Sequence, residues 1–190
     1  VYGLDAAGGQ LLWRRPVGLE TRIHPLAVGK APDVDALLAD GARNELVRVA
    51  GRTGKLLWRL AVGERFATPA IAGSRALLTT ETGALWEIDL ETGTCGRRIQ
   101  FPQSLSIEPG PISATGVTYQ VGSHSHVYAV SVDKLQCREV FYLGHRAGTI
   151  VVPPVMSLNH LVIAENAGAD YSLLHVLATN AEGVALERPV

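Results

Sequence analysis

The stretch Leu46-Val47-Arg48-Val49-Ala50-Gly51-Arg52-Thr53-Gly54-Lys55-Leu56-Leu57-Trp58 decides the fold of this chain. At its start apolar and polar residues alternate, so Val47 and Val49 face one side of a strand and Arg48 faces the other. The Thr53-Gly54 pair is typical of a tight turn between antiparallel strands, because glycine adopts the positive φ that such turns need. The stretch therefore predicts a β-hairpin that ends near Trp58.

The same hairpin pattern recurs along the chain. Residues 1–13 and 85–93 are close copies, and residues 127–133 and 173–177 are weaker ones. Successive equivalent positions are separated by 45, 39, 42 and 46 residues; they are Leu4, Val49, Ile88, Val130 and Val176. A period of about 40–45 residues with four strands per repeat is typical of β-propeller blades.

A second marker stands roughly twenty residues before each later hairpin. It is a proline with small apolar neighbours, and we expect it in the innermost strand of a blade, strand A, at residues 25–28, 69–72, 111–114 and 154–157. Strand B is expected at residues 76–80, 117–121 and 161–164, and residues 33–38 are expected at the entrance of an earlier strand B. The recurring hairpin supplies strands C and D.

The repeat predicts an all-β chain, a β-propeller built from four-stranded antiparallel blades. We expect a separate C–D hairpin at 1–18 and blades at 19–62, 63–101, 102–143 and 144–190, with a short last strand D at 184–190. Because closed propellers need about four to eight complete blades, we expect an incomplete ring of about four blades plus the hairpin. Further sequence or another chain would complete it.

The composition excludes several other classes of protein. The chain has 190 residues with 47% hydrophobic and 18% charged residues and a formal net charge of -1, which indicates a folded domain. Its basic residues form no stripe interleaved with aromatic ones, so no nucleic acid partner is expected. No apolar run reaches the roughly 18 residues of a membrane span, so no membrane span is expected in this segment.

The recurring pattern resembles the PQQ-like (quinoprotein-like) repeat family, whose blades carry the signature Leu-Tyr-Ala-Leu-Asp-x-x-Thr-Gly-x-x-x-Trp. This family includes quinoprotein alcohol dehydrogenases and the scaffold lipoprotein of the outer-membrane β-barrel assembly machine. The resemblance implies that Trp13 and Trp58 are the tryptophans that join neighbouring blades. Arg97 and Glu139 stand at this position in the next two copies, where we expect the junction to be missing. The resemblance also implies an extracytoplasmic protein, in the periplasm or cell envelope.

The expected topology places the B–C turns and the D–A connections on one face of the propeller. Binding-surface candidates on this face are His124, His126, His145, Arg146, Arg65 and Asp170. His124 and His126 could hold a metal ion, but no third ligand follows at a diagnostic spacing, so ordinary polar turn residues are the favoured interpretation and no metal site is predicted. Asp5 and Asp89 end strand C and are expected to accept hydrogen bonds from turn amides.

No motif for catalysis or cofactor binding stands out. Cys95 and Cys137 occupy equivalent points on outer strands of successive blades, so we expect free, partly buried thiols. The resemblance implies an adjacent-cysteine pair in the cofactor pocket of the quinoprotein alcohol dehydrogenases, and this chain has no such pair, so no cofactor is expected. Together these features favour a non-catalytic binding or scaffold module, whose partner is another protein or the remaining propeller blades. A fragment of a quinone-dependent dehydrogenase and an extracytoplasmic sensor domain of a signalling protein stay open as alternatives.

Overall fold

The computed structural model describes residues 1–18, 23–30, 34–105, 108–110, 112–124, 126–144 and 146–180. Within these residues every regular element is a β-strand, which confirms the all-β prediction. The chain divides into two compact units. Unit 1 comprises Val1–Phe66 and Asp89–Thr94, and unit 2 comprises Ala67–Ile88 and Cys95–Val190. No helix in the described part of the chain has the length and apolar character needed to cross a bilayer.

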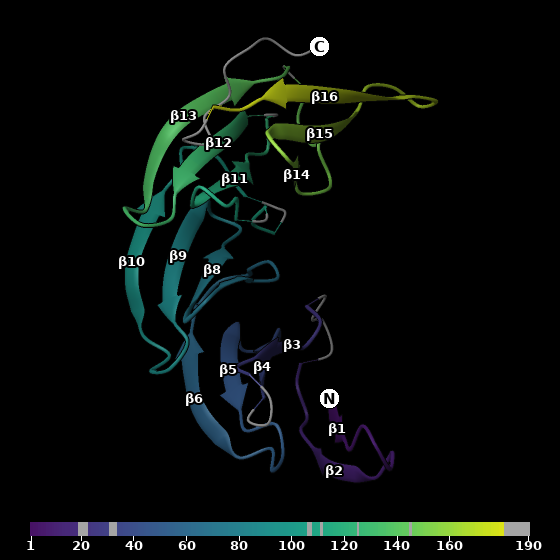
Figure 1. The fold of residues 1–190 in the computed structure, drawn as a ribbon, viewed down its shortest axis with the longest axis vertical. Helices are drawn as coiled ribbons and strands as arrows, with labels where there is room; N and C mark the ends of the chain where they lie inside the picture. Colours follow the sequence, from purple (N-terminus) through teal and green to yellow (C-terminus); the bar gives the residue numbers. More distant parts are fainter. Residues whose placement is uncertain are drawn as a thin grey trace. The chain divides into compact units, whose positions relative to one another are not determined.

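Unit 1 contains one hairpin and one four-stranded antiparallel sheet (Figure 1). The hairpin pairs β1 (Tyr2–Leu4) with β2 (Leu11–Arg14). The sheet has the order β3-β4-β5-β6, with strands β3 (Leu26–Val28), β4 (Asp35–Asp40), β5 (Glu45–Val49) and β6 (Leu56–Ala61). This order is the A-B-C-D order predicted from the repeat.

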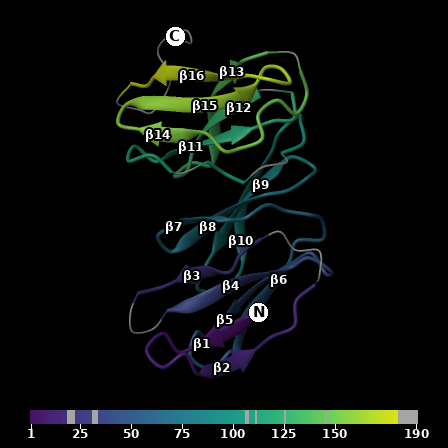
Figure 2. The same ribbon diagram turned by 90° about the vertical axis from the view of Figure 1, so that its right-hand side faces the viewer.

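Unit 2 contains three further antiparallel sheets. The first has the order β10-β9-β8-β7, with β7 (Ala70–Ala72), β8 (Arg75–Thr79), β9 (Ala84–Asp89) and β10 (Cys95–Gln100). The second has β11 (Val117–Val121), β12 (His126–Ser131) and β13 (Gln136–Tyr142). The third has β14 (Val155–Ser157), β15 (His160–Asn166) and β16 (Ser172–Ala178), which lie side by side in Figure 2.

Over the described residues 112–114, the innermost strand expected at 111–114 is not present beside β11 in the sheet of β11, β12 and β13. The segment before β11 does follow that strand, since Gly110 donates to the Tyr119 carbonyl over 3.2 Å and Ser113 donates to the Val117 carbonyl over 2.8 Å. These two hydrogen bonds stand in place of the regular ladder that β3, β7 and β14 form with their neighbours. The strand expected at 184–190 lies outside the described residues.

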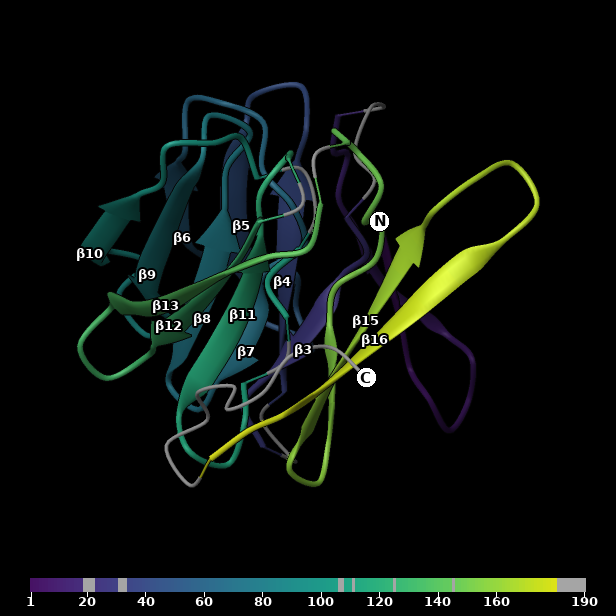
Figure 3. The same ribbon diagram turned by 90° about the horizontal axis from the view of Figure 1, so that it is seen from above.

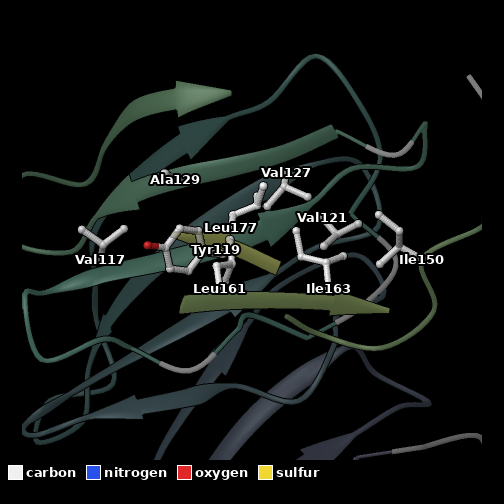
Figure 4. Packing of buried hydrophobic residues seen from close by; sticks show 9 residues of the cluster. All are labelled: Val117, Tyr119, Val121, Val127, Ala129, Ile150, Leu161, Ile163 and Leu177. Atoms are coloured by element: carbon white, nitrogen blue, oxygen red, sulfur yellow. The ribbon is translucent and has the colours of Figure 1, made fainter. Parts of the chain in front are cut away.

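A hydrophobic core joins the last two sheets of unit 2. Figure 4 shows its nine buried side chains: Val117, Tyr119, Val121, Val127, Ala129, Ile150, Leu161, Ile163 and Leu177. Seven of them come from alternating positions of β11, β12 and β15, because successive side chains of a strand point to opposite faces, whereas Leu177 lies on β16 and Ile150 on the connection after β13. Each large side chain that is fully buried contributes roughly 1.5–3 kcal/mol to stability, so this core holds the loops around it in place.

Two tryptophans dock onto the C–D turn of the following repeat. Trp13 donates from Nε1 to the Gly51 carbonyl over 2.7 Å, and Trp58 donates to the Leu90 carbonyl over 2.8 Å; both contacts lie in unit 1. Each indole ring also packs on a glycine with positive φ, at Gly54 and Gly93, where a Cβ atom would overlap the ring. The junctions that the resemblance implied at Trp13 and Trp58 are confirmed.

The prediction that this junction is missing at Arg97 is wrong. Arg97 stands nine residues after Ile88, as Trp58 does after Val49, and it donates to the carbonyls of Val132 (3.2 Å) and Asp133 (2.6 Å). Its guanidinium is also paired with Glu87, and this hydrogen bond raises the pKa of Arg97. A guanidinium has five N–H donors, so it can replace the indole donor and bind a carboxylate at the same time.

The turn opposite Arg97 has changed as well. Leu135 stands where Gly54 and Gly93 stand in the other two turns, and it keeps their backbone conformation with φ at 46°. Its side chain is 7% exposed and packs in a second core of unit 2 with Leu77, Leu85 and Val130. The arginine and the leucine therefore replace the tryptophan and the glycine as a pair.

An ion pair joins strands B and C in two successive blades, and the strand that carries the acidic residue differs between them. In unit 1, Asp35 of β4 accepts from Arg48 of β5 over 2.9 and 2.5 Å. In unit 2, Arg75 of β8 donates to Glu87 of β9 over 3.2 Å. Asp35 and Arg75 are each the first residue of their strand, so the signs of the two partners are exchanged between the blades.

Candidate binding surface

The connection that follows β10 is hydrogen-bonded to the B–C turns of two successive blades. At one end, the Phe101 N–H donates to the Gly83 carbonyl over 2.8 Å. Further along, the Ser104 carbonyl accepts from the Ser123 N–H over 3.0 Å. The connection thus holds the turn between β8 and β9 and the turn between β11 and β12 at fixed positions beside it.

The connection that follows β13 repeats this arrangement. Its Gly148 N–H donates to the Ser123 carbonyl over 2.9 Å, and its Thr149 carbonyl accepts from the Asn166 N–H over 2.8 Å. Arg146 adds a side-chain bond to the Ala167 carbonyl over 3.3 Å, in the turn between β15 and β16 that Figure 3 shows in yellow-green. We call the continuous surface formed by residues 81–83, 103–105, 122–124, 126, 146–149 and 166–170 the loop surface of unit 2.

Gln103 lies at the centre of this surface. Its Oε1 accepts from the His124 N–H over 3.1 Å, and its Nε2 lies 2.7 Å from Nδ1 of His126. Two glycines leave room for it: a Cβ at Gly122 would overlap the Gln103 side chain, and a Cβ at Gly83 would overlap its backbone carbonyl. Gln103 therefore fixes the turn that carries both histidines.

Aromatic side chains surround His126. The ring of Tyr142, its cross-strand partner on β13, lies 4.7 Å from the imidazole at 56°, and Tyr142 keeps 49% exposure. The Tyr128 ring lies 6.1 Å away and nearly parallel, and burial, followed by the nearby Cys137, raises the pKa of its phenol. Half-exposed tyrosines with a fixed orientation are typical of protein-binding surfaces.

A buried polar group holds the other end of the loop surface. Glu165 is 8% exposed and accepts from the Thr149 hydroxyl over 3.0 Å, while its second oxygen lies 2.7 Å from Nε2 of His175. The carboxylate therefore links the Thr149 hydroxyl, on the connection after β13, to the His175 imidazole on β16. This arrangement supports the connection on which Arg146 lies.

The structure brings together four of the six predicted surface residues. His124 and Asp170 are exposed, Arg146 is exposed and bonded to the neighbouring turn, and His126 is partly exposed. Arg65 is exposed on the connection after β6, but it belongs to unit 1 and is not part of this surface. His145 lies outside the described residues.

Sequence reasoning missed the residues that hold the surface together. Gln103 lies on the connection after β10 and Tyr142 and Glu165 lie in strands with no motif around them, whereas His175 lies in the weak repeat copy at residues 173–177, which does not mark it as a contact residue. The expected role of Asp5 and Asp89 is confirmed: Asp5 accepts from the Gly8 N–H over 2.7 Å and Asp89 from the Thr92 N–H over 2.8 Å. Cys95 and Cys137 are free thiols, the first exposed and the second partly buried. Over the described ranges, no three His, Cys, Asp or Glu side chains group as metal ligands.

Repeated antiparallel sheets, three of which dock onto the next turn from the same repeat position through Trp13, Trp58 and Arg97, define this chain as a β-propeller repeat protein. The family model described as "Outer membrane protein assembly factor BamB", of the PQQ-like type, matches residues 1–96. The chain belongs to this PQQ-like family. No curated protein matches its sequence.

Solved structures share the fold at low sequence identity. BamB from Moraxella catarrhalis is 17% identical with a TM-score of 0.68, over 98% of this chain and 56% of that one. Saccharomyces cerevisiae Sqt1 is 11% identical with a TM-score of 0.71, over 100% of this chain and 65% of that one. Hydrazine synthase of Kuenenia stuttgartiensis is 14% identical with a TM-score of 0.63, over 82% of this chain and 46% of that one. This chain therefore spans less than two thirds of each.

Proposed function

We propose that this chain is a non-catalytic binding and scaffold module of a larger bacterial protein or assembly, located outside the cytoplasm. In this proposal the loop surface of unit 2 binds a protein partner and needs no cofactor. The adjacent cysteines of a quinone pocket are absent from the sequence, and Cys95 and Cys137 lie on different sheets, so the residues present do not fit that group.

One observation carries the proposal: the loops of the surface are bonded to one another through their backbones while the side chains of His124, Arg146 and Asp170 are exposed. A surface that is already ordered loses less conformational entropy when it binds. Loops held by a rigid scaffold are also where proteins most often carry recognition residues. The description of the matching family as an assembly factor supports a protein partner in the cell envelope.

The hairpin of unit 1 supports the second half of the proposal, that further blades or another chain complete the propeller. Among the described residues, β1 and β2 pair only with each other. They expose Tyr2 (69%), Leu4 (60%) and Leu11 (58%), and apolar surface on an unpaired hairpin is costly to leave in water. This chain also spans 56% of the BamB structure it resembles, which leaves room for additional blades.

Site-specific photo-crosslinking in living cells tests the binding surface. A photoreactive residue placed at His124 or at Asp170 is expected to give one discrete crosslinked product, whose partner mass spectrometry identifies as a cell-envelope protein. Thr115 is the matched control, because it is exposed on the A–B turn of the same blade as His124, at the opposite end of the strands.

A charge substitution provides an independent measurement. Arg146→Glu is expected to weaken capture of the identified partner, whereas Lys134→Glu, an exposed substitution of the same charge change on a C–D turn, is expected to leave it unchanged. Equal crosslinking from Thr115 and His124, or equal loss of capture in both charge variants, would remove the loop surface as the binding site.

A further inference from the structure

One nitrogen of the loop surface lies between two groups that require opposite protonation states. Nδ1 of His126 is 2.7 Å from Nε2 of Gln103, which can only donate a hydrogen bond. The same Nδ1 is 3.2 Å from the backbone carbonyl of His124, which can only accept one. A neutral Nδ1 with a lone pair satisfies the first group, and a protonated Nδ1 satisfies the second.

The orientation of the Gln103 amide decides which state the described structure holds. Its Oε1 accepts from the His124 N–H, a backbone donor that cannot change its role. Nε2 must therefore be the atom that faces His126, and it donates to an unprotonated Nδ1. The proton of the neutral ring is then on Nε2.

We propose that His126 is a proton-controlled clasp that sets the shape of the loop surface. At neutral pH, His126 accepts from Gln103 and the connection after β10 is fastened to the turn that carries His124. Protonation of Nδ1 places two N–H groups against each other over the 2.7 Å contact, so Gln103 is released and Nδ1 donates to the His124 carbonyl instead. Histidine is the side chain that ordinarily changes charge between about pH 5 and pH 8, and this is the range over which the clasp is to be tested.

The surroundings of the ring agree with a switch of hydrogen-bond partner. Among the described residues, the phenol rings of Tyr142 and Tyr128 lie against the imidazole, and His124 precedes it in the same turn. His124 is exposed and its Nδ1 lies 3.0 Å from the Ser123 hydroxyl, so it is held by a separate contact. The Gln103 amide is the neighbour that discriminates between the two forms of His126, because its Nε2 can donate to an unprotonated Nδ1 but not to a protonated one.

The binding consequence of this inference rests on the proposed function, since Gln103 orders the turn on which His124 is exposed. Release of Gln103 frees that turn, and a partner must then pay the cost of ordering it again. We therefore expect the loop surface to bind its partner more weakly in acid.

Nitrogen-15 NMR of the full chain labelled at its six histidines tests the clasp without any partner. At about pH 8 we expect the Nε2–H tautomer at His126. On lowering the pH, the His124 amide and the Gln103 side-chain amide are expected to shift together with the His126 ring. The conservative variant Gln103→Glu replaces the donor by an acceptor and should convert His126 to a form protonated at Nδ1. His160→Gln, an exposed histidine outside the surface, is the control.

The possible outcomes separate this inference from the proposed function. An Nδ1–H tautomer in the unmodified chain, or a Gln103 amide that does not follow the His126 titration, overturns the clasp whatever the crosslinking shows. If the Gln103 amide follows the His126 ring in the NMR experiment but crosslinking from His124 is equal at about pH 7.5 and pH 5.5, only the regulation of binding is overturned. Absence of a crosslink at both pH values counts against the proposed function and leaves the NMR result standing.

Discussion

Arg97 donates from Nη2 to the carbonyl oxygen of Val132 over 3.2 Å, from the repeat position at which Trp58 reaches Leu90. The two donors differ in shape and charge, yet each reaches the carbonyl two residues after the central position of the next repeat. Arg97 is also bonded to Glu87, which is 7% exposed, so it satisfies a buried carboxylate that an indole could not. The docking position is thus defined by the acceptor and tolerates more than one donor.

Arg97→Ala is expected to destabilise the chain by about 1–2 kcal/mol, because it removes charge-assisted bonds to two carbonyls and leaves Glu87 with Arg75 alone. The side chain is 37% exposed, and we therefore choose the lower part of the usual range. Chemical denaturation measures the loss. Arg98→Ala removes the same charge from the next residue of the strand, which is exposed, and should be nearly neutral; equal losses in both variants would refute the docking role of Arg97.

A double-mutant cycle tests whether Arg97 and Leu135 replace the tryptophan–glycine pair together. Arg97→Trp alone should be destabilising, because a Cβ at the equivalent glycines would overlap the indole ring. Adding Leu135→Gly removes that overlap and relieves a positive φ of 46°. We expect a favourable coupling energy of about 1–3 kcal/mol between the two substitutions in denaturation experiments. Additive effects would show that the two positions are independent.

Trp58→Phe isolates the hydrogen bond of the docking tryptophan from its packing. The Leu90 carbonyl also accepts from Arg48 over 2.5 Å, so it keeps a partner, and the loss should be about 1 kcal/mol. Trp58→Ala also removes a ring that is 8% exposed, and should cost about 3–5 kcal/mol. Thermal and chemical unfolding give both values. A larger loss of unfolding free energy for Trp58→Phe than for Trp58→Ala would contradict this separation of the hydrogen bond from the packing.

The exposed thiol of Cys95 is expected to react slowly with alkylating agents near neutral pH. Burial raises its pKa above the ordinary value, Arg98 lowers it and Glu87 raises it, with burial the largest cause. A raised pKa means that the reactive thiolate forms only at higher pH, so the rate should be below that of free cysteine at about pH 8 and approach it as the pH rises. Peptide-resolved mass spectrometry measures this rate, and Arg98→Ala should lower it further. A rate above that of free cysteine would contradict the assignment.

Much of the fold could be predicted because strand and turn signals are local. The alternation around Val49 and the glycine at 54 are visible in the sequence, and strands A, B and C followed from their spacing to the next hairpin. The exception was the innermost strand expected at 111–114, because no strand pairs with β11 over the described residues 112–114. Prolines do not explain this difference, since β14 forms directly after Pro153 and Pro154.

The candidate surface was predictable only in part. Its exposed residues, such as His124 and Arg146, lie in recognisable turns. Gln103, Glu165 and Arg97 act through partners 10 to 36 residues away, and only the three-dimensional pairing of strands and loops brings those partners together. From the sequence alone, an arginine at the repeat position of the tryptophan indicates that the docking contact is absent. The structure shows that the arginine binds the same carbonyl acceptor.

The exchanged signs of the pairs Asp35–Arg48 and Arg75–Glu87 have a consequence for how a repeated chain finds its correct partners. Strands B of similar sequence compete for the same strand C while the chain is being synthesised, and exchange between repeats is a common error of such proteins. If β4 paired with β9, two carboxylates would meet; if β8 paired with β5, two guanidiniums would meet. Asp35 is the diagonal neighbour of Arg48 in the register, and like charges at neighbouring positions destabilise a strand pair, so we expect each hairpin to favour its own strand over that of the next repeat.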